Sequence, residues 1–207
     1  MKNKIIWLGL ICSLAAAMLL ASCSASTTAS TTALPPTSTT TAVTTSNSMV
    51  GATVLTVTEG SQTKTYSLAD LQALPSVSGY GGQIGKSNAI TGPDSYQGVA
   101  LTTLLNAVGG ITAVQNVIIT GSDNYSQTLS YQQVTTDNFT LFDAVSGQQS
   151  AAPDMTPQVF VAYEKNGNPL DADTGPFEFG VMTCQNRVTQ GSLWVKQLAK
   201  IEVVAAP

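Results

Sequence analysis

The sequence of 207 residues contains no histidine. This absence excludes hydrolases built on a Ser-His-Asp or Cys-His arrangement, and it removes the ligand on which most zinc and copper sites depend. Cysteine is also rare, because only Cys12, Cys23 and Cys184 are present. So few cysteines exclude the disulfide framework that stabilises many small secreted domains.

Charged residues are scarce as well, at 10% of the chain, and carboxylates outnumber cations. The formal net charge is -4, and it becomes -6 when Lys2 and Lys4 are removed with the N-terminal segment described next. Binding to DNA or RNA depends on a basic surface that neutralises phosphates. The charge therefore excludes nucleic acid as a partner.

The N-terminal segment has the order of a secretory signal, with two lysines ahead of an apolar run over residues 5–20. The run is short for a membrane-spanning helix, which needs about 20 residues. The motif Leu-Ala-Ser-Cys at positions 20–23 resembles the bacterial lipobox, whose cysteine carries lipid. We therefore expect residues 1–22 to be a lipoprotein signal peptide and Cys23 to anchor the protein on a membrane, outside the cytoplasm. A plain secretory signal and an uncleaved membrane helix are the alternatives.

The composition changes after the signal. Residues 23–48 are almost entirely serine, threonine and alanine, without a charged side chain. Such a segment has too little apolar surface to offset its chain entropy, which predicts a flexible stalk. Residues 49–207 have a mixed composition and the length of one domain. Cys184 is the one cysteine in this range, so an acylated Cys23 would leave no intrachain disulfide.

Short elements alternate along the domain. Ser67 and Asp70 have the spacing of a capping box and predict a helix that ends at Pro75. Leucines at helical spacing predict a helix over residues 101–108, and residues 193–204 are expected to begin helical and end as a strand. Apolar or alternating runs predict strands within 52–68, 116–122, 126–131, 158–170 and 177–183. The pattern indicates an α+β domain with mixed or mostly antiparallel sheets and short helices.

Five segments, in this order, carry a resemblance to a known family: "YSLADLQALP", "YQGVALTTLLNAVGG", "VIITGSDNYSQTLSYQQV", "VFVAYEKNGNPLDADTGPFEFGV" and "LWVKQLAKIEVV". Together they resemble the oxidoreductase molybdopterin-binding domain of the sulfite oxidase type, over residues 52–204. The resemblance implies the mixed fold of that domain. It also implies a molybdopterin cofactor and redox chemistry.

The sequence departs from the family at the metal ligand. In the molybdenum enzymes of this family, a cysteine between the first helix and the "Y-x-G-V-x-L" segment binds the metal through its thiolate. This interval contains no cysteine here, and Ser78, Ser87 and Ser95 fall in or beside it. Cys184 comes much later in the chain and does not match that ligand.

Cations suited to an anionic pterin phosphate are also few. The interval offers Lys86, and Arg187 and Lys196 follow farther along the chain. Convergence of these three side chains on one cleft would indicate an anion site. A scattered arrangement would indicate that they serve solubility.

Residues 79–101 form a glycine-rich stretch that lacks the spacing of a nucleotide-binding loop. Its glycines favour tight turns and close backbone approach, and a ligand pocket is the alternative. Seven side chains are candidates for such a pocket: Tyr80, Lys86, Ser87, Asn88, Asp123, Tyr125 and Arg187. Asp123 and Tyr125 are also residue types that end a strand in a turn.

The missing thiolate favours a noncatalytic module that binds a small molecule or a surface protein, without a metal or catalytic residue. We expect no cofactor under this hypothesis. The alternative is a molybdopterin-dependent oxidoreductase whose metal is held by oxygen ligands or by the cofactor alone. The residues leave open whether the protein is an enzyme.

Overall fold

The computed structural model describes residues 54–150 and 156–207. The predicted signal peptide, Cys23 and the stalk lie outside the described residues, as do residues 49–53 of the predicted domain. Within the described ranges, no helix is both long enough and apolar enough to cross a membrane.

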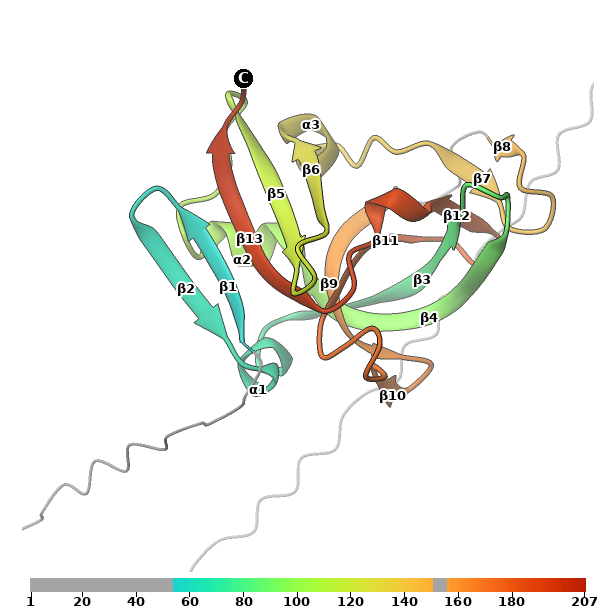
Figure 1. Cartoon of the computed structure of the whole chain (residues 1–207), viewed down its shortest axis with the longest axis horizontal. Helices are drawn as coiled ribbons and strands as arrows, with labels where there is room; N and C mark the ends of the chain where they lie inside the picture. The colour runs from blue at the N-terminus through green and yellow to red at the C-terminus, as the bar shows by residue number, and fades with distance from the viewer. Residues whose placement is uncertain (1–53, 151–155) are drawn as a thin grey trace, which may run out of the picture. The chain divides into compact units, whose positions relative to one another are not determined.

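The first and last strands of the domain meet in a five-stranded sheet (Figure 1). Its order is β2-β1-β13-β5-β6, and β1 runs parallel to β13 while the other neighbours are antiparallel. The strands are β1 (Leu55–Glu59), β2 (Gln62–Tyr66), β5 (Gln115–Gly121), β6 (Ser126–Ser130) and β13 (Leu198–Ala205).

A second sheet contains eight strands in the order β10-β9-β11-β3-β12-β7-β8, and β4 pairs with both β3 and β9. The strands are β3 (Ser76–Ile84), β4 (Ile90–Ala100), β7 (Leu141–Asp143), β8 (Gln149–Ser150), β9 (Gln158–Lys165), β10 (Asn168–Pro169), β11 (Glu178–Thr183) and β12 (Arg187–Gln190). Since β3, β4, β9 and β11 pair in a closed circuit, they enclose an interior of their own.

The helices are short. The capping box of Ser67 and Asp70 opens α1 (Leu68–Gln72), as predicted, and a second box of Ser130 and Gln133 opens α3 (Tyr131–Thr135). The remaining helices are α2 (Leu101–Asn106) and the 3₁₀ turn η1 (Gly191–Leu193). The mixed sheets and short helices agree with the predicted class, but the domain is more sheet-rich than a balanced α+β fold.

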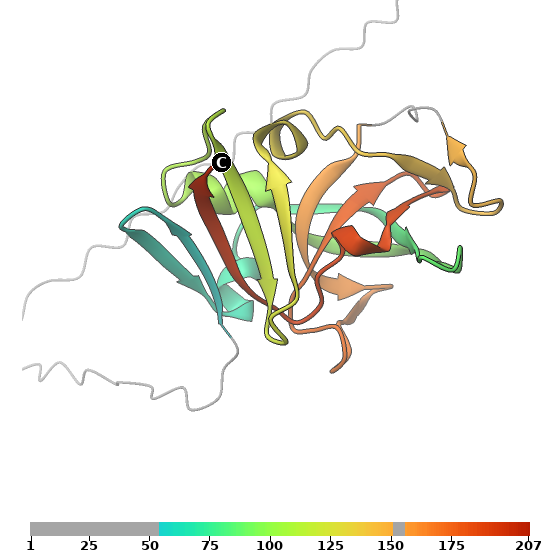
Figure 2. The same ribbon diagram turned by 45° about the horizontal axis from the view of Figure 1, so that its top comes forward.

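One hydrophobic core joins the two sheets. Helix α2 contacts β1 of the first sheet and β4 and β9 of the second, and Figure 2 shows it behind β13 and β5. Its Leu101, Leu104 and Leu105 are buried, as their helical spacing predicts. All residues of β11 are buried because the strand is covered on both faces.

The glycine-rich stretch forms most of a β-hairpin, which corrects the expectation of turns. Gly79, Gly81 and Gly82 lie inside β3, and none of them has a positive φ. Two of these positions require glycine because neighbouring side chains lie too close for a Cβ. A Cβ on Gly81 would lie 2.6 Å from Cη2 of Trp194, and one on Gly82 would lie 2.8 Å from Cγ1 of Val188. The turn is limited to the hairpin tip at residues 85–89.

The expected helix at the start of residues 193–204 is also wrong. After η1, Trp194 and Val195 are extended, because Val195 exchanges backbone hydrogen bonds of 2.8 and 3.0 Å with Phe179 of β11. This bridge places the Trp194 ring inside the closed circuit of strands. Trp194 is 5% exposed, and its ring packs on Tyr96 of β4 and Phe160 of β9.

Candidate functional site

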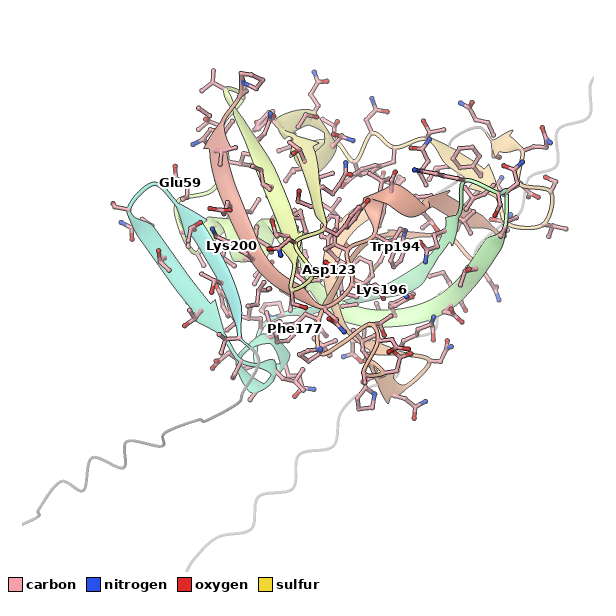
Figure 3. All side chains as sticks on the ribbon, in the orientation of Figure 1. Glu59, Asp123, Phe177, Trp194, Lys196 and Lys200 are labelled. Carbon is pink, nitrogen blue, oxygen red and sulfur yellow. The ribbon has the colours of Figure 1, made fainter. Side chains whose placement is uncertain are left out.

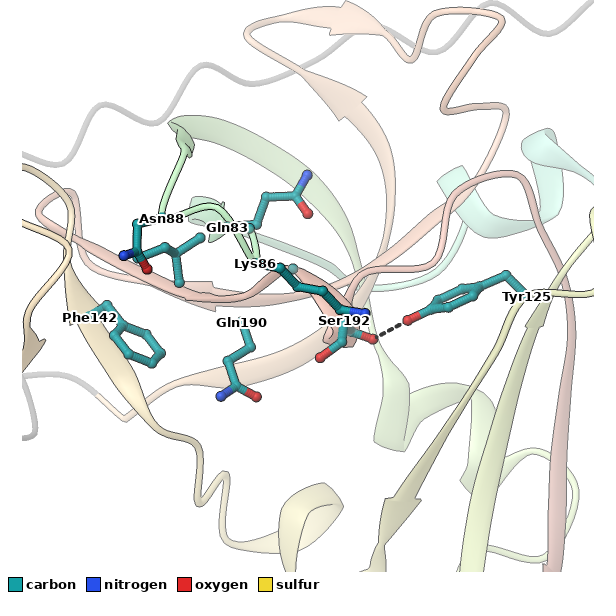
Figure 4. A pocket seen from close by; sticks show the side chains of 10 residues that line it. Gln83, Lys86, Asn88, Tyr125, Phe142, Gln190 and Ser192 are labelled. Carbon is teal, nitrogen blue, oxygen red and sulfur yellow. Dashed lines mark hydrogen bonds between the residues drawn. The ribbon is translucent and has the colours of Figure 1, made fainter.

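A cavity of about 700 Å³ lies beside the tip of the β3–β4 hairpin (Figure 4). This volume is in the usual range of small-molecule sites. Ten residues line it: Gln83, Ile84, Gly85, Lys86, Asn88, Tyr125, Phe142, Gln190, Gly191 and Ser192. We call it the large cavity.

The hairpin tip supplies one wall of the large cavity. Gly85 donates a backbone hydrogen bond of 2.8 Å to Ala89, and Asn88 donates one of 2.9 Å to Gly85. Asn88 closes this tight turn with a φ of 60°, a conformation that asparagine tolerates better than most residues. The turn thereby fixes the positions of Lys86 and Asn88 at the cavity.

The opposite wall comes from distant parts of the chain. Strand β12 runs parallel to β3 and places Gln190 opposite Ile84, and η1 follows it directly. Tyr125 reaches the cavity from the turn between β5 and β6 in the other sheet. Its hydroxyl donates a hydrogen bond of 2.8 Å to the carbonyl oxygen of Ser192 (Figure 4).

Three of the seven candidate pocket residues line the large cavity, namely Lys86, Asn88 and Tyr125. Asp123 lies behind Tyr125, where its Oδ1 accepts a hydrogen bond of 2.9 Å from the Tyr125 backbone. Asp123 therefore stabilises the turn after β5, which is the alternative to a role in a pocket.

The other three candidates lie elsewhere. Ser87 belongs to the same hairpin tip but does not line the cavity, and the exposed Tyr80 lies on β3 opposite Thr183. Arg187 on β12 pairs with Asp143 of β7 at 3.5 Å. Hydrogen bonds to Ser146 and to the Val145 backbone, together with the Arg187 charge, lower the pKa of Asp143.

Several residues that line the large cavity were not predicted from the sequence. Gln190 and Ser192 flank Gly191, just ahead of the Trp-Val-Lys motif. This glycine is the one local sign in the sequence of a turn at the cavity. Gln83 lies in the glycine-rich stretch, and Phe142 lies in the short strand β7. No local pattern marks the latter two as neighbours.

Comparison with known proteins agrees with this fold. The sequence profile described as the oxidoreductase molybdopterin binding domain matches residues 53–207. The chain belongs to this family. The resemblance predicted from five segments is thereby confirmed, and a comparison with curated protein sequences gave no match.

Among solved structures, the family fold is seen in the sulfane dehydrogenase SoxCD from Paracoccus pantotrophus. It is 15% identical to this chain with a TM-score of 0.51, and the alignment covers 72% of this chain and 37% of that chain. The molybdopterin-binding domain described here thus spans little more than a third of its structural relative. At this identity the likeness establishes the fold alone.

The residues at the large cavity do not fit the metal centre of the family. Among the described residues that line it there is no thiolate, carboxylate or imidazole, and Lys86 is the one cation. Cys184 lies away from it, and its thiol donates to Asn186. Across residues 54–150 and 156–207, no three acidic, cysteine or histidine side chains gather as a metal site requires.

The three cations named as a possible anion site do not converge on one cleft. Lys86 lines the large cavity, Arg187 pairs with Asp143, and Lys196 lines a different, smaller cavity. This is the scattered arrangement, which does not favour a multiply charged phosphate. The donor set instead suits an organic molecule with several hydrogen-bonding groups.

Proposed function

We propose that this domain is a noncatalytic binding module that retains the molybdopterin-binding fold. The observation that carries the proposal is the chemistry of the large cavity. The interval in which relatives hold a cysteine ligand forms one wall, and in this chain that wall presents Gly85, Lys86 and Asn88. A cavity of this size with such a wall supports the binding of a small organic ligand.

The lining indicates the class of ligand. Amide groups of Gln83, Asn88 and Gln190 can both donate and accept hydrogen bonds, and Ile84 and Phe142 provide an apolar surface. Lys86 adds a single positive charge. We infer a polar, partly aromatic or aliphatic molecule that is neutral or carries one negative charge.

The same lining argues against a reaction in the cavity. General acid–base catalysis needs a group that exchanges a proton near neutral pH, and covalent catalysis needs an activated nucleophile. Among the described lining residues, the Ser192 and Tyr125 hydroxyls have no carboxylate or imidazole base beside them in the cavity. Binding without turnover is the function that these groups support.

The sequence supports a location for this module outside the cytoplasm. We propose that residues 1–22 are removed, that Cys23 carries lipid, and that residues 23–48 hold the domain away from the membrane. A tethered module can collect a small molecule at the surface or present it to a neighbouring protein. Ligand capture and partner binding are both compatible with a stalk.

Metal and pterin analysis of the protein from its native host tests the proposal. We expect neither molybdenum nor tungsten, and no pterin fluorescence after extraction. About one metal and one pterin per chain would overturn it and establish the alternative, an oxidoreductase with ligation by oxygen or by the cofactor alone. The native host matters because a foreign host can fail to insert the cofactor.

A further inference from the structure

A second cavity, of about 140 Å³, lies at the closed circuit of strands. All four strands of that circuit contribute to it, and the Trp194 ring lies against it. It is lined by Gly82, Gln83, Thr91, Asp94, Tyr96, Lys165, Asp171, Thr174, Glu178, Trp194 and Lys196. Gln83 is the one described residue that it shares with the large cavity.

Glu178 is the unusual residue of this small cavity. Its side chain belongs to a residue that is 2% exposed, and its Oε2 has no hydrogen-bond partner among the described residues. Carboxylates are rarely buried unless they are paired, since burial disfavours the charged form. Burial raises the pKa of Glu178 to about 7, although the charges of Lys165 and Lys196 act in the opposite direction.

Most other charges at the cavity are already satisfied by the protein. Lys165 pairs with Asp94 at 2.7 Å, and its ammonium lies 5.5 Å from the centre of the Tyr96 ring. Asp171 accepts hydrogen bonds from the backbone and hydroxyl of Thr174, which lower its pKa. These contacts leave Glu178 as the carboxylate without a full set of partners.

Lys196 supplies the complementary charge. It is exposed and comes directly after Val195, whose bridge to Phe179 fixes Trp194; both Trp194 and Lys196 are labelled in Figure 3. No carboxylate in residues 54–150 or 156–207 lies within 4.0 Å of its ammonium, so it forms no ion pair there. A buried acid and an unpaired lysine thus line one small cavity without touching each other.

We propose that the small cavity binds a small zwitterion of the amino-acid class, with its ammonium group toward Glu178 and its anionic group toward Lys196. The cavity volume of about 140 Å³ suits a ligand of only a few heavy atoms, such as glycine or alanine. An ammonium group supplies the donors that the Glu178 carboxylate lacks, and Lys196 selects for a negative charge at the other end. This inference goes beyond the proposed function, because it concerns another cavity and another class of ligand.

Calorimetric titration of the full chain with three probes tests the proposal. L-alanine carries both charges, ethylammonium chloride only the positive one, and sodium propionate only the negative one. We expect L-alanine to bind at least tenfold more tightly than either single-charge probe. Equal binding of ethylammonium, or no binding of L-alanine at millimolar concentration, would overturn the assignment.

Two variants place the ligand. Glu178→Gln keeps the shape but removes the charge, and we expect at least tenfold weaker binding of L-alanine. Lys196→Gln is expected to weaken binding three- to tenfold, while Lys200→Gln is the matched control because Lys200 lies on β13 and pairs with Glu202 at 2.7 Å. Unchanged binding in Lys196→Gln would overturn the proposal. The three-probe comparison needs no variant and decides the matter even if Glu178→Gln fails to fold.

Discussion

The Tyr125 hydroxyl donates a hydrogen bond of 2.8 Å to the Ser192 carbonyl, and this contact links the two sheets at the edge of the large cavity. Tyr125 comes from the turn after β5, and Ser192 lies in η1. The Asp123 carboxylate holds the Tyr125 backbone in place. The large cavity therefore depends on a contact between residues that are 67 positions apart.

Tyr125→Phe removes this contact and keeps the ring. Because Tyr125 is 43% exposed, water replaces part of the lost hydrogen bond, and we expect a decrease of about 0.5 kcal/mol in the free energy of unfolding. Urea unfolding measures it. Tyr80→Phe is the matched control, since Tyr80 is similarly exposed and does not line the cavity. An equal loss in both variants would contradict the role of the Ser192 contact.

Gly180→Ala tests the space around Trp194. An added Cβ would lie 2.4 Å from Cζ3 and 2.6 Å from Cε3 of the ring. The indole is enclosed and cannot move away, so we expect a loss of about 3 kcal/mol in stability, at the upper end for overpacked cores.

Gly85→Ala is the control for that measurement. Its added Cβ would come no closer than 3.6 Å to another atom, and Gly85 has no positive φ. We expect its free energy of unfolding, measured with urea, to change by no more than about 0.5 kcal/mol. A Gly180→Ala protein as stable as this control would show that the ring has room.

Glu178 predicts an unusual dependence of stability on pH. Its pKa is about 7 in the folded protein, against an ordinary value of 4.5, so the folded state holds the proton more tightly than the unfolded chain. Its contribution is fully present below pH 4.5 and is lost as the pH rises through 7. The loss is roughly 3 kcal/mol. The charged and titratable groups that face it are Tyr96, Asp94, Lys165, Asp171 and Lys196.

The difference between the wild type and Glu178→Gln isolates this effect. Urea unfolding from pH 4 to pH 8 should show the wild type losing stability relative to the variant across the range. Burial also raises the pKa of Asp137, but that contribution is common to both proteins and cancels in the difference. A constant difference between pH 4 and pH 8 would mean that Glu178 ionises freely.

Cys23→Ala tests the proposed anchor. Acyl chains hold a protein on a bilayer with about 0.8 kcal/mol for each buried methylene group, so their loss should release the protein. We expect the variant in the soluble fraction of the native host and the wild type in the membrane fraction. Retention of the variant on the membrane would contradict lipid attachment at this residue.

Local signals predicted the parts of the fold that depend on nearby residues. The capping box at Ser67 placed α1, and the leucine spacing placed α2. The same capping signature at Ser130 marks α3, but it directly follows the alternating pattern of a strand over residues 126–130. Here the information was present in the sequence and was outweighed by a neighbouring pattern.

Long-range contacts account for what the sequence did not predict. The ring of Trp194 packs so closely on Gly81 and Gly180 that neither position has room for a Cβ, and nothing local to either glycine shows this. Glu178 resembles an ordinary polar residue at the start of a strand, and its burial arises only when the strand circuit closes. Lys86 and Asn88 were predicted as pocket residues from the glycine-rich stretch. The Ser192 side of the large cavity could not be predicted, because it depends on the pairing of β3 with β12.

Gln83 lines both cavities, so a molecule bound in one cavity would share a neighbouring residue with a molecule bound in the other. If the Gln83 amide bonds to both occupants, it cannot offer the same hydrogen bonds to both at once, and the two binding events would then be coupled. Such coupling is reciprocal: if filling the small cavity alters affinity in the large one by some factor, the reverse effect has the same factor. A single glutamine would then let the domain respond to two chemically different molecules together.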